Sequence, residues 1–191
     1  MSTLRPALVL LALFTFLTGV LYPALVTGVA QALFSDRANG SLLASNTQTS
    51  LSQGSRLIGQ PFRGPRYFWS RPSATAPQPY NAAASSGSNL GPLHPALQQG
   101  VAQRVAVLRD ASGDHARVPV DLVTSSASGL DPHISPAGAL YQVARVAQAR
   151  GLAVDQVRKL VRMHIEPRSF GILGEPRVNV LELNLALDGL H

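Results

Sequence analysis

The sequence predicts a single N-terminal transmembrane helix followed by a mixed α/β (α+β) extracytoplasmic domain. No charged residue occurs between Arg5 and Asp36, and about 20 apolar residues suffice to cross a bilayer as a helix. Beyond this span, segments with helical periodicity alternate with short β-prone and turn-rich segments. Apolar residues make up 46% of the chain, which is too many for a disordered protein.

The apolar span is expected to form a membrane helix over residues 6–34, kinked at Pro23. A cleaved signal peptide is one alternative, because Ala30-Gln31-Ala32 fits the small-x-small cleavage rule. However, the apolar core of a signal peptide is usually about 7–15 residues long. The other alternative is a buried core helix, which rarely stays uncharged for so long. A membrane anchor is therefore favoured.

Flanking charges predict the orientation of this helix. Arg5 lies on its N-terminal side, whereas Asp36 and Arg37 cancel each other on the other side. Positive charge favours the cytoplasmic side, so residues 1–5 are expected in the cytoplasm and the remainder outside it. Within the helix, Ala24, Gly28 and Ala32 place small residues at a spacing of four. Such a stripe lets a partner helix approach closely in lipid, although small residues are also common in any membrane helix.

Residues 35–54 are rich in Ser, Asn, Gln and Thr, and they predict a polar tether with little structure of its own. The outer domain then covers residues 55–191. It begins with two β-prone pieces, 56–58 and 67–69, separated by a turn at Gly64-Pro65. Residues 70–93 show no periodicity, and an unpatterned stretch of this length is commonly functional or mobile.

Between residues 94 and 164, three helices and one strand are expected: helices over 94–109, 135–151 and 154–164, and a strand over 117–123. The middle helix has the clearest ends, because Ser135 is a typical N-cap, Pro136 suits the first turn and Gly151 suits the stop. Its buried face is predicted from apolar spacing, with its arginines pointing elsewhere; the face comprises Leu140, Val143, Ala144 and Ala147.

Residues 178–187 are ambiguous. Alternating leucines suit a strand, whereas Pro176 before the segment and Gly189 after it favour a helix. We expect the helix.

Composition and motifs exclude several function classes. Without cysteine there is no disulfide framework, thiolate metal site or cysteine nucleophile. The excess of 16 Lys+Arg over 10 Asp+Glu is not gathered into a basic block, which argues against nucleic-acid binding. No Walker-type phosphate loop, zinc-protease motif or serine-hydrolase motif occurs. Asp131 and His133 lie close together, but the proline between them indicates an ordinary turn rather than a metal or acid–base pair. No catalytic or metal-binding residue is therefore predicted.

Two other features could contact a ligand. In the loop 85–92, Gly87 and Gly91 free backbone donors beside Ser85 and Ser88, which could wrap an anion; a flexible polar loop is the simpler interpretation. Gln142 lies at the edge of the apolar face of the helix over 135–151. It could bond a ligand or a partner, although a glutamine in such a place is more often half exposed.

Several motifs follow one another in a recognisable order behind the membrane helix. They are YFWSRPS at 67–73, Tyr80-Asn81, SSGSNLGP at 85–92, SGLDPHISP at 128–136 and GEPRVNVL at 174–181. Together they resemble the C subunit of the bacterial Kdp potassium-transporting ATPase, over essentially the whole chain. The resemblance implies a non-catalytic subunit in the bacterial inner membrane. Its implied partners are a potassium-translocating channel-like subunit, a P-type ATPase subunit, a small membrane peptide subunit and membrane lipid.

The resemblance also implies a role as assembly factor and catalytic chaperone, which raises the ATP affinity of the ATPase subunit through a shared nucleotide site. The positions linked with ATP in the family correspond here to Gln142 and to the loop residues Ser85, Gly87, Ser88 and Asn89. This chain has Ser86 where the family loop usually has its first glycine, which reduces backbone freedom.

The implied ATP site conflicts with the predicted topology, because a domain outside the cytoplasm meets little ATP. An alternative from a different class avoids the conflict: the outer domain caps the potassium entrance and controls ion access and complex stability without touching nucleotide. A third interpretation, a membrane-anchored hydrolase that uses the serine-rich loop, has the weakest support because no triad motif accompanies the loop.

Overall fold

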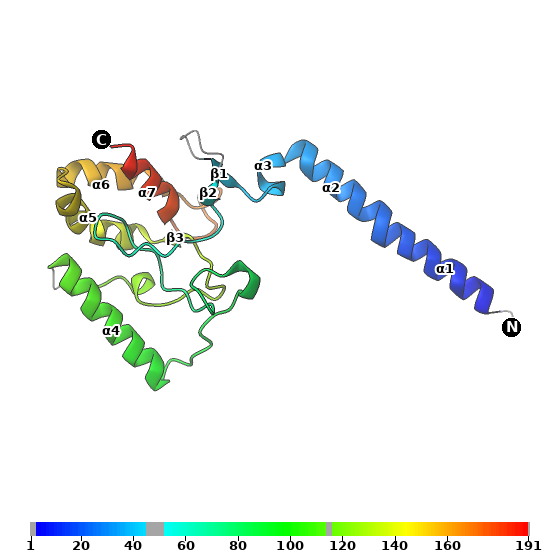
Figure 1. The fold of residues 1–191 in the computed structure, drawn as a ribbon, viewed down its shortest axis with the longest axis horizontal. Coiled ribbons are helices and arrows are strands. Elements are labelled where there is room, and N and C mark those ends of the chain that lie inside the picture. The colour runs from blue at the N-terminus through cyan, green and yellow to red at the C-terminus, as the bar shows by residue number, and fades with distance from the viewer. Residues whose placement is uncertain (1–2, 45–51, 114–115, 191) are drawn as a thin grey trace. The chain divides into compact units, whose positions relative to one another are not determined.

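The structure is a computed structural model that describes residues 3–44, 52–113 and 116–190. The chain forms two compact units, Met1–Ser55 and Arg56–His191, and Figure 1 traces the order of their elements. Each unit is described separately.

The first unit begins with one continuous helix, Leu4–Leu33, with a mean hydropathy of 2.2 and none of its residues buried. It consists of α1 (Leu4–Phe16), a π-helical segment η1 (Leu17–Leu21) and α2 (Tyr22–Leu33). Pro23 cannot donate a backbone hydrogen bond and its ring crowds the preceding turn, so the wider π-helical turn falls where the proline disturbs the ladder. The sequence prediction of a long N-terminal apolar helix is confirmed.

The stretch after this helix has more structure than its polar composition predicts. It contains α3 (Ser35–Ala38), β1 (Leu42–Ala44) and β2 (Ser52–Ser55), with β1 and β2 paired antiparallel. Gly40 turns the chain at a positive φ of 86°, and the Ser55 hydroxyl donates to the Gly40 carbonyl at 2.7 Å. Backbone pairing needs no apolar side chains, which is why composition alone misses it. Residues 45–51 of the expected tether lie outside the described residues.

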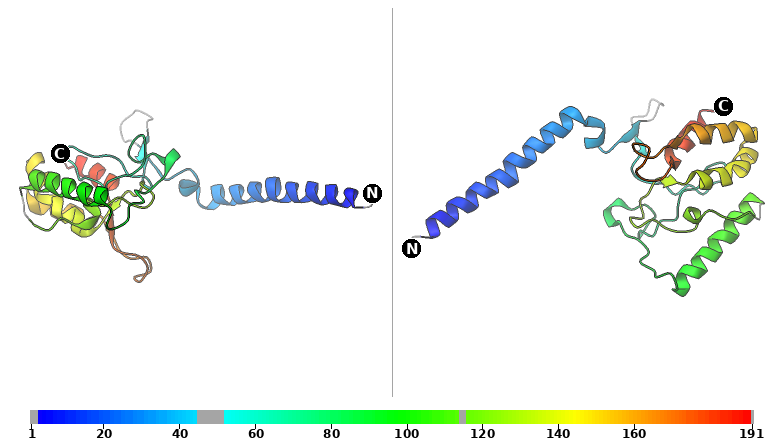
Figure 2. Two further views of the ribbon diagram at one scale, coloured as in Figure 1. Left: turned by 90° about the horizontal axis from the view of Figure 1, so that it is seen from below. Right: turned by 180° about the vertical axis from the view of Figure 1, so that it is seen from behind.

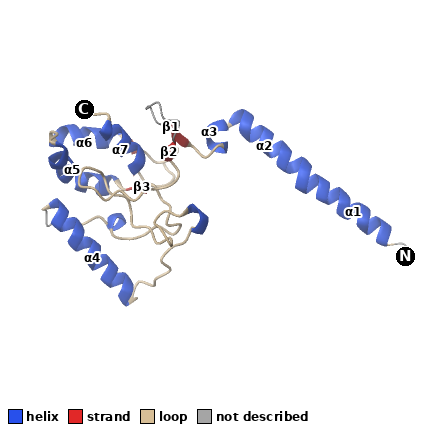
Figure 3. Ribbon diagram, viewed as in Figure 1, coloured by secondary structure: helices blue, strands red, loops and turns tan. Residues whose placement is uncertain are grey.

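The second unit combines helices with one small sheet, and Figure 3 shows how far helix and loop dominate it. The sheet has the order β3-β5-β4 and is antiparallel throughout. Its strands are β3 (His133–Ile134), β4 (Ile165–Glu166) and β5 (Arg177–Asn179). Val178 is the central residue, opposite Ile134 on one side and Ile165 on the other. The mixed α+β class is confirmed.

The main helices agree with the sequence prediction. They are α4 (Pro95–Ser112), α5 (Pro136–Arg150), α6 (Val154–Met163) and α7 (Val180–Asp188). At the start of α5 the Ser135 hydroxyl accepts from the Gly138 amide at 2.9 Å, and Gly151 ends the helix in the left-handed conformation. A short helix, η2 (Ala82–Ala84), lies in the loop before α4.

Three element predictions are wrong. Residues 56–58 and 67–69 are not strands; only the turn between them, closed by a bond from the Tyr67 amide to the Gly64 carbonyl, is found. The strand expected at 117–123 is replaced by a 3-10 turn, η3 (Val120–Leu122), which follows Pro119. Residues 178–187, for which strand and helix were both considered, contain a strand end followed by a helix. Strand β5 ends at Asn179, and α7 begins at the next residue. The Asn179 side chain caps α7 by accepting from the Glu182 amide.

The core lies between the sheet and helices α5, α6 and α7, whose packing the views in Figure 2 follow from two further sides. The predicted face of α5 is half right: Val143 and Ala147 are buried in the core, but Leu140 and Ala144 are exposed, whereas Gln142 and Arg145 are buried. Apolar spacing misplaced part of this face because the Gln142 and Arg145 side chains enter the interior, where they bond backbone groups of residues 65–69. The large apolar side chains that are fully buried are Phe68, Ile134, Val146, Val157, Val161, Val178, Val180, Leu183 and Leu187.

Candidate functional site

Residues 67–69 have no neighbouring strand among the described residues, and side chains bond their backbone groups instead. Gln142, on α5, is fully buried. Its Oε1 accepts from the Trp69 amide at 2.7 Å, and its Nε2 donates to the Trp69 carbonyl at 3.1 Å. One amide side chain thus satisfies both backbone groups of Trp69, as a strand residue would.

Asn184, on α7, does the same for the preceding residue. It is buried, its Oδ1 accepts from the Phe68 amide at 2.9 Å, and its Nδ2 donates to the Phe68 carbonyl at 3.0 Å. The Phe68 side chain is fully buried in the core. Two helices distant in sequence therefore hold consecutive residues of one segment.

Arg145 fixes the turn before this segment. Its guanidinium donates to the carbonyls of Pro65 at 2.7 Å and Tyr67 at 3.0 Å, and to Oε1 of Gln142 at 2.7 Å. The same guanidinium lies 4.2 Å from the ring centre of Trp69, a cation–π contact. Burial lowers the pKa of Arg145 to about 10, so it remains charged at neutral pH.

Arg150, at the end of α5, also binds the segment of residues 65–69. It donates to the Arg66 carbonyl at 2.7 Å and pairs with the Asp188 carboxylate at 2.6 Å. Its guanidinium lies 4.9 Å from the Tyr67 ring centre, and the Tyr67 hydroxyl donates to Asp188 at 3.3 Å. The segment 65–69 is thereby fixed on both sides.

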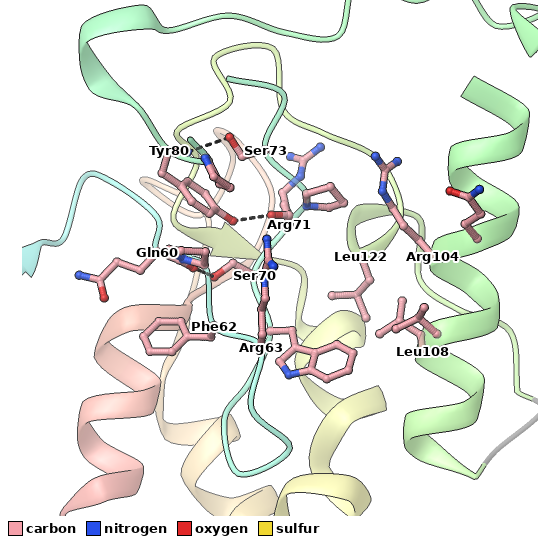
Figure 4. A pocket seen from close by; sticks show the side chains of 16 residues that line it. Gln60, Phe62, Arg63, Ser70, Arg71, Ser73, Tyr80, Arg104, Leu108 and Leu122 are labelled. Atoms are coloured by element: carbon pink, nitrogen blue, oxygen red, sulfur yellow. Dashed lines mark hydrogen bonds between the residues drawn. The ribbon is translucent and has the colours of Figure 1, made fainter. Parts of the chain in front are cut away.

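One face of this segment borders a pocket of about 560 Å³. Figure 4 shows the pocket between α4, which provides Arg104 and Leu108, and the loop that carries Gln60, Arg71 and Tyr80. Its walls combine aromatic rings with three guanidinium groups, and no Asp or Glu among the described residues lines it. The lining includes Phe62, Arg63, Trp69, Arg71, Tyr80 and Arg104.

Two of the three arginines already have partners. Arg71 pairs with the Asp131 carboxylate at 3.0 Å and donates to the Ser125 carbonyl. Arg104 donates to the Val123 carbonyl at 2.9 Å. Arg63 is exposed and makes no hydrogen bond or ion pair with the described residues. Because Asp131 compensates the charge of Arg71, an anion entering the pocket would meet positive charge from Arg104 and Arg63 that is uncompensated among the described residues.

The polar side of the pocket belongs to the unpatterned stretch of residues 70–93. The Tyr80 hydroxyl donates to the Arg71 carbonyl, and the Tyr80 amide donates to the Ser73 hydroxyl at 2.9 Å. Burial raises the pKa of Tyr80 above its ordinary value, which keeps its hydroxyl protonated as a donor. Ser73 in turn donates to the Gly129 carbonyl at 2.7 Å. Side-chain hydrogen bonds, rather than periodic packing, give this stretch its structure.

Asp131 and His133 form a structural turn. The Asp131 carboxylate accepts from the backbone and from the ring of His133, and it pairs with Arg71. Burial opposes its ionisation, but the hydrogen bonds from His133 and the charge of Arg71 outweigh that effect and hold the pKa of Asp131 below its ordinary value. Within the described part of the chain, no three His, Asp or Glu side chains are placed to hold a metal ion.

The loop 85–92, for which an anion-binding role and a flexible polar loop were both considered, packs against another loop. The Ser85 hydroxyl and the Ser86 amide both donate to the Ser128 carbonyl. A Cβ on Gly87 would lie 2.8 Å from the Ala127 carbonyl oxygen, so the glycine allows close contact between two backbones. Ser88 and Asn89 are exposed. Their side chains remain accessible to a ligand or partner.

The structure does not join the predicted nucleotide residues into one hydrogen-bonded group. Among the described residues, the hydrogen-bond partners of Gln142 are Trp69, Gly138 and Arg145, and none lies in the loop 85–89. On the helix Leu4–Leu33, Ala24, Gly28 and Ala32 are exposed, and a Cβ on Gly28 would meet nothing within 4 Å. That surface is open to lipid or to another helix.

Sequence reasoning missed Asn184 and Arg145 as key residues of this site. Both occur in helices whose polar residues are expected to face solvent. A polar residue on the core side of a helical pattern is the only signal that could have found them: Asn184 lies between Leu183 and Leu187 on the buried face of α7. Gln142 was identified, but its full burial was not predicted.

Comparison with known proteins agrees with the resemblance seen in the motifs. A family model described as the KdpC family, K+-transporting ATPase, c chain, matches residues 4–189. The chain is 60% identical to the potassium-transporting ATPase KdpC subunit of Methylococcus capsulatus, over 98% of this chain and 97% of that protein. It is 62% identical to the corresponding subunit of Variovorax paradoxus, over 98% and 96% of the two chains.

Proposed function

The chain belongs to the KdpC family, the c chain of the K+-transporting ATPase, and we propose that it is the non-catalytic, single-pass subunit that holds this pump together from the extracytoplasmic side. The other Kdp subunits are then its partners. Its own helix Leu4–Leu33 provides the anchor.

In this proposal the three partners have distinct roles. The channel-like subunit moves potassium, the P-type ATPase subunit hydrolyses ATP, and the small membrane peptide packs beside them. The second unit, from Arg56 onward, caps the potassium entrance, where it controls ion access and stabilises the complex. The orientation follows from the single cation Arg5 at the N-terminal end of the helix.

The full engagement of Gln142 is the observation that carries this proposal. The side chain is fully buried and both its amide atoms are bonded within the domain. A nucleotide could contact it only after displacing Trp69, which would leave buried polar groups unpaired. The residue most closely linked with ATP in the family therefore has a structural task here, which favours a rigid cap over a shared nucleotide site.

The second candidate is the chaperone role, in which this subunit raises the ATP affinity of the pump. Its support is the pocket with three guanidinium groups beside aromatic rings, a chemistry that suits phosphates and a stacked base. Exposed Ser88 and Asn89 add accessible polar groups. Gln142 then acts as a positioning residue, because it holds the backbone of Trp69, which lines the pocket.

Steady-state ATPase assays on the assembled complex, with ATP and potassium varied separately, distinguish the two roles. Arg63→Ala and Asn89→Ala remove exposed side chains, so both variants should fold. The cap predicts an unchanged ATP requirement. The chaperone role predicts an ATP requirement roughly ten- to hundredfold higher, since one hydrogen bond to a charged group contributes about 1.5–3 kcal/mol and about 1.4 kcal/mol corresponds to a tenfold change. Arg109→Ala, an exposed arginine of α4 outside the pocket, is the matched control and should change neither requirement.

A further inference from the structure

The loop that joins β4 to β5 exposes large apolar side chains at its tip. Phe170 is 92% exposed, Ile172 74% and Leu173 58%, and residues 167–175 are exposed throughout. In the left view of Figure 2 this loop projects away from the helices of the domain. We call residues 167–175 the apolar loop. Three neighbouring exposed apolar residues on a projecting loop mark an interaction site more often than isolated ones do.

The apolar loop holds a defined conformation. The amide of Ser169 donates to the carbonyl of Leu173, and the amide of Leu173 donates back to the carbonyl of Ser169, each at 2.9 Å. Gly171 and Gly174 adopt positive φ angles, as does Phe170 at 55°. A positive φ is unfavourable for a bulky residue, and the exposed Phe170 ring gains no burial in this chain that would offset it. Such local strain in an exposed loop suggests a functional constraint.

The charges at the base of the apolar loop are paired. Arg168 binds both oxygens of the Glu175 carboxylate, at 2.7 and 2.9 Å. Below this pair, Arg177 donates to Glu166 at 2.8 Å, across the pairing of β4 with β5. The two salt bridges join the two ends of the apolar loop and leave its base with no net charge.

We propose that the apolar loop is a docking element that inserts Phe170, Ile172 and Leu173 into an apolar pocket on another subunit of the complex. This inference deepens the proposed function, because it names a contact through which the domain would be held on the pump. A preformed loop loses little conformational freedom on docking, and an aromatic anchor with aliphatic neighbours is a common centre of a protein interface.

The paired charges favour a protein partner over the membrane surface. A loop that binds an anionic bilayer combines apolar residues with unpaired Lys or Arg, whereas the arginines here are neutralised by Glu175 and Glu166. A protein pocket needs only the apolar tip and a polar rim without unpaired charge. A lipid contact and a second copy of this chain remain as distinct outcomes of the test.

Site-specific photocrosslinking in the assembled, membrane-embedded complex identifies the occupant directly. With p-benzoylphenylalanine in place of Phe170, irradiation should give an adduct with another Kdp subunit. The same probe in place of Met163, which is 69% exposed on α6, is the control and should give no such adduct. An adduct with lipid, an adduct with a second copy of this chain, or no adduct at position 170 would overturn the proposal.

A second measurement tests whether the contact holds the subunit on the pump. Phe170→Ser should weaken retention of this subunit in detergent-solubilised complex by about thirtyfold, as expected for loss of a central anchor. Leu93→Ser, at a residue 85% exposed, should leave retention unchanged. Equal retention of the two variants, with both proteins folded, would contradict the docking role. The proposed cap could still stand in that case, because its ATP and potassium dependences are measured separately.

Discussion

The helix Leu4–Leu33 and the segment of residues 67–69 satisfy their backbone polar groups in opposite ways. In the helix, backbone amides beyond the first turn donate to carbonyls of the preceding turn, except at Pro23, which has no N–H, and no residue is buried. In the segment, the backbone groups of Phe68 and Trp69 are bonded by Asn184 and Gln142, whose separations in sequence are 116 and 73 residues. One region depends on its own composition, and the other depends on two distant helices.

This difference predicts which substitutions should destabilise each region. The helix needs only apolar side chains and a bilayer, so a charge within it should matter more than the loss of any one contact. The segment 67–69 has no regular partner, so removal of a single amide leaves two buried backbone groups unpaired. A change in one region should leave the other intact, and the following predictions test that independence.

The largest effect is expected for Asn184→Ala. The change leaves the buried amide and carbonyl of Phe68 without partners, at about 1–3 kcal/mol for each group. We expect the domain to lose about 2–6 kcal/mol of unfolding free energy, measured by chemical denaturation of the full chain in detergent. The amides of Phe68 and Trp69 should exchange faster with solvent. Gln148→Ala, exposed on α5, is the control. Equal stability of the two variants would show that the hydrogen bonds between Asn184 and Phe68 are dispensable.

The next effect concerns Val20→Arg, near the middle of the membrane helix. A charged residue at that depth costs about 2.5–3.5 kcal/mol on insertion scales, so the fraction of chains integrated into membrane should fall sharply. Carbonate extraction of membranes measures that fraction, and Val20→Leu should behave like the unchanged chain. Denaturation of the detergent-solubilised domain should be unaffected. A domain destabilised by Val20→Arg would break the proposed independence of the two regions.

A smaller effect is expected for Gly28→Leu, which fills the stripe of Ala24, Gly28 and Ala32. If this stripe packs against a partner helix, the larger side chain separates the two helices and weakens their association by about 1–2 kcal/mol. The complex should then release this subunit more readily in mild detergent. Val29→Leu, one position away, is the matched control. Equal release of both variants would leave the outer domain as the main contact.

The smallest effect is a dependence of stability on pH through Asp131. Its pKa lies below the ordinary value of 3.8 in the folded domain. The ionised carboxylate therefore stabilises the fold above that value, and the contribution is lost as the pH falls from about 3.8 through the folded pKa. Asp131→Asn should reduce the acid sensitivity of unfolding, whereas Asp155→Asn, at an exposed carboxylate, should not. Identical acid profiles for both variants would remove Asp131 from this account.

The regions that sequence reasoning predicted are those with local causes. The helix Leu4–Leu33 follows from missing charge, and α5 follows from the Ser135 cap and the Gly151 stop. The sequence also identified Gln142 and the motif around Asp131, the first by its place on a helix and the second by resemblance.

The predictions that failed depend on distant partners. The β-prone residues at 67–69 form no strand, and Gln142 and Asn184 bond the backbone groups that a neighbouring strand would bond. Part of the buried face of α5 was misplaced because Arg145 enters the interior to bind carbonyls of another segment. Periodicity places a charged residue outward by default, and only tertiary contacts reverse that choice.

The side of the membrane on which the second unit lies tests the central claim most directly. The chain has no cysteine, so single cysteines in Thr3→Cys and Met163→Cys can be probed in intact spheroplasts with a membrane-impermeant maleimide, with denatured samples as the measure of full reactivity. The account predicts that Met163→Cys reacts before permeabilisation and Thr3→Cys only afterwards. Reaction of Thr3→Cys alone in intact spheroplasts would contradict it and place the domain where ATP is available.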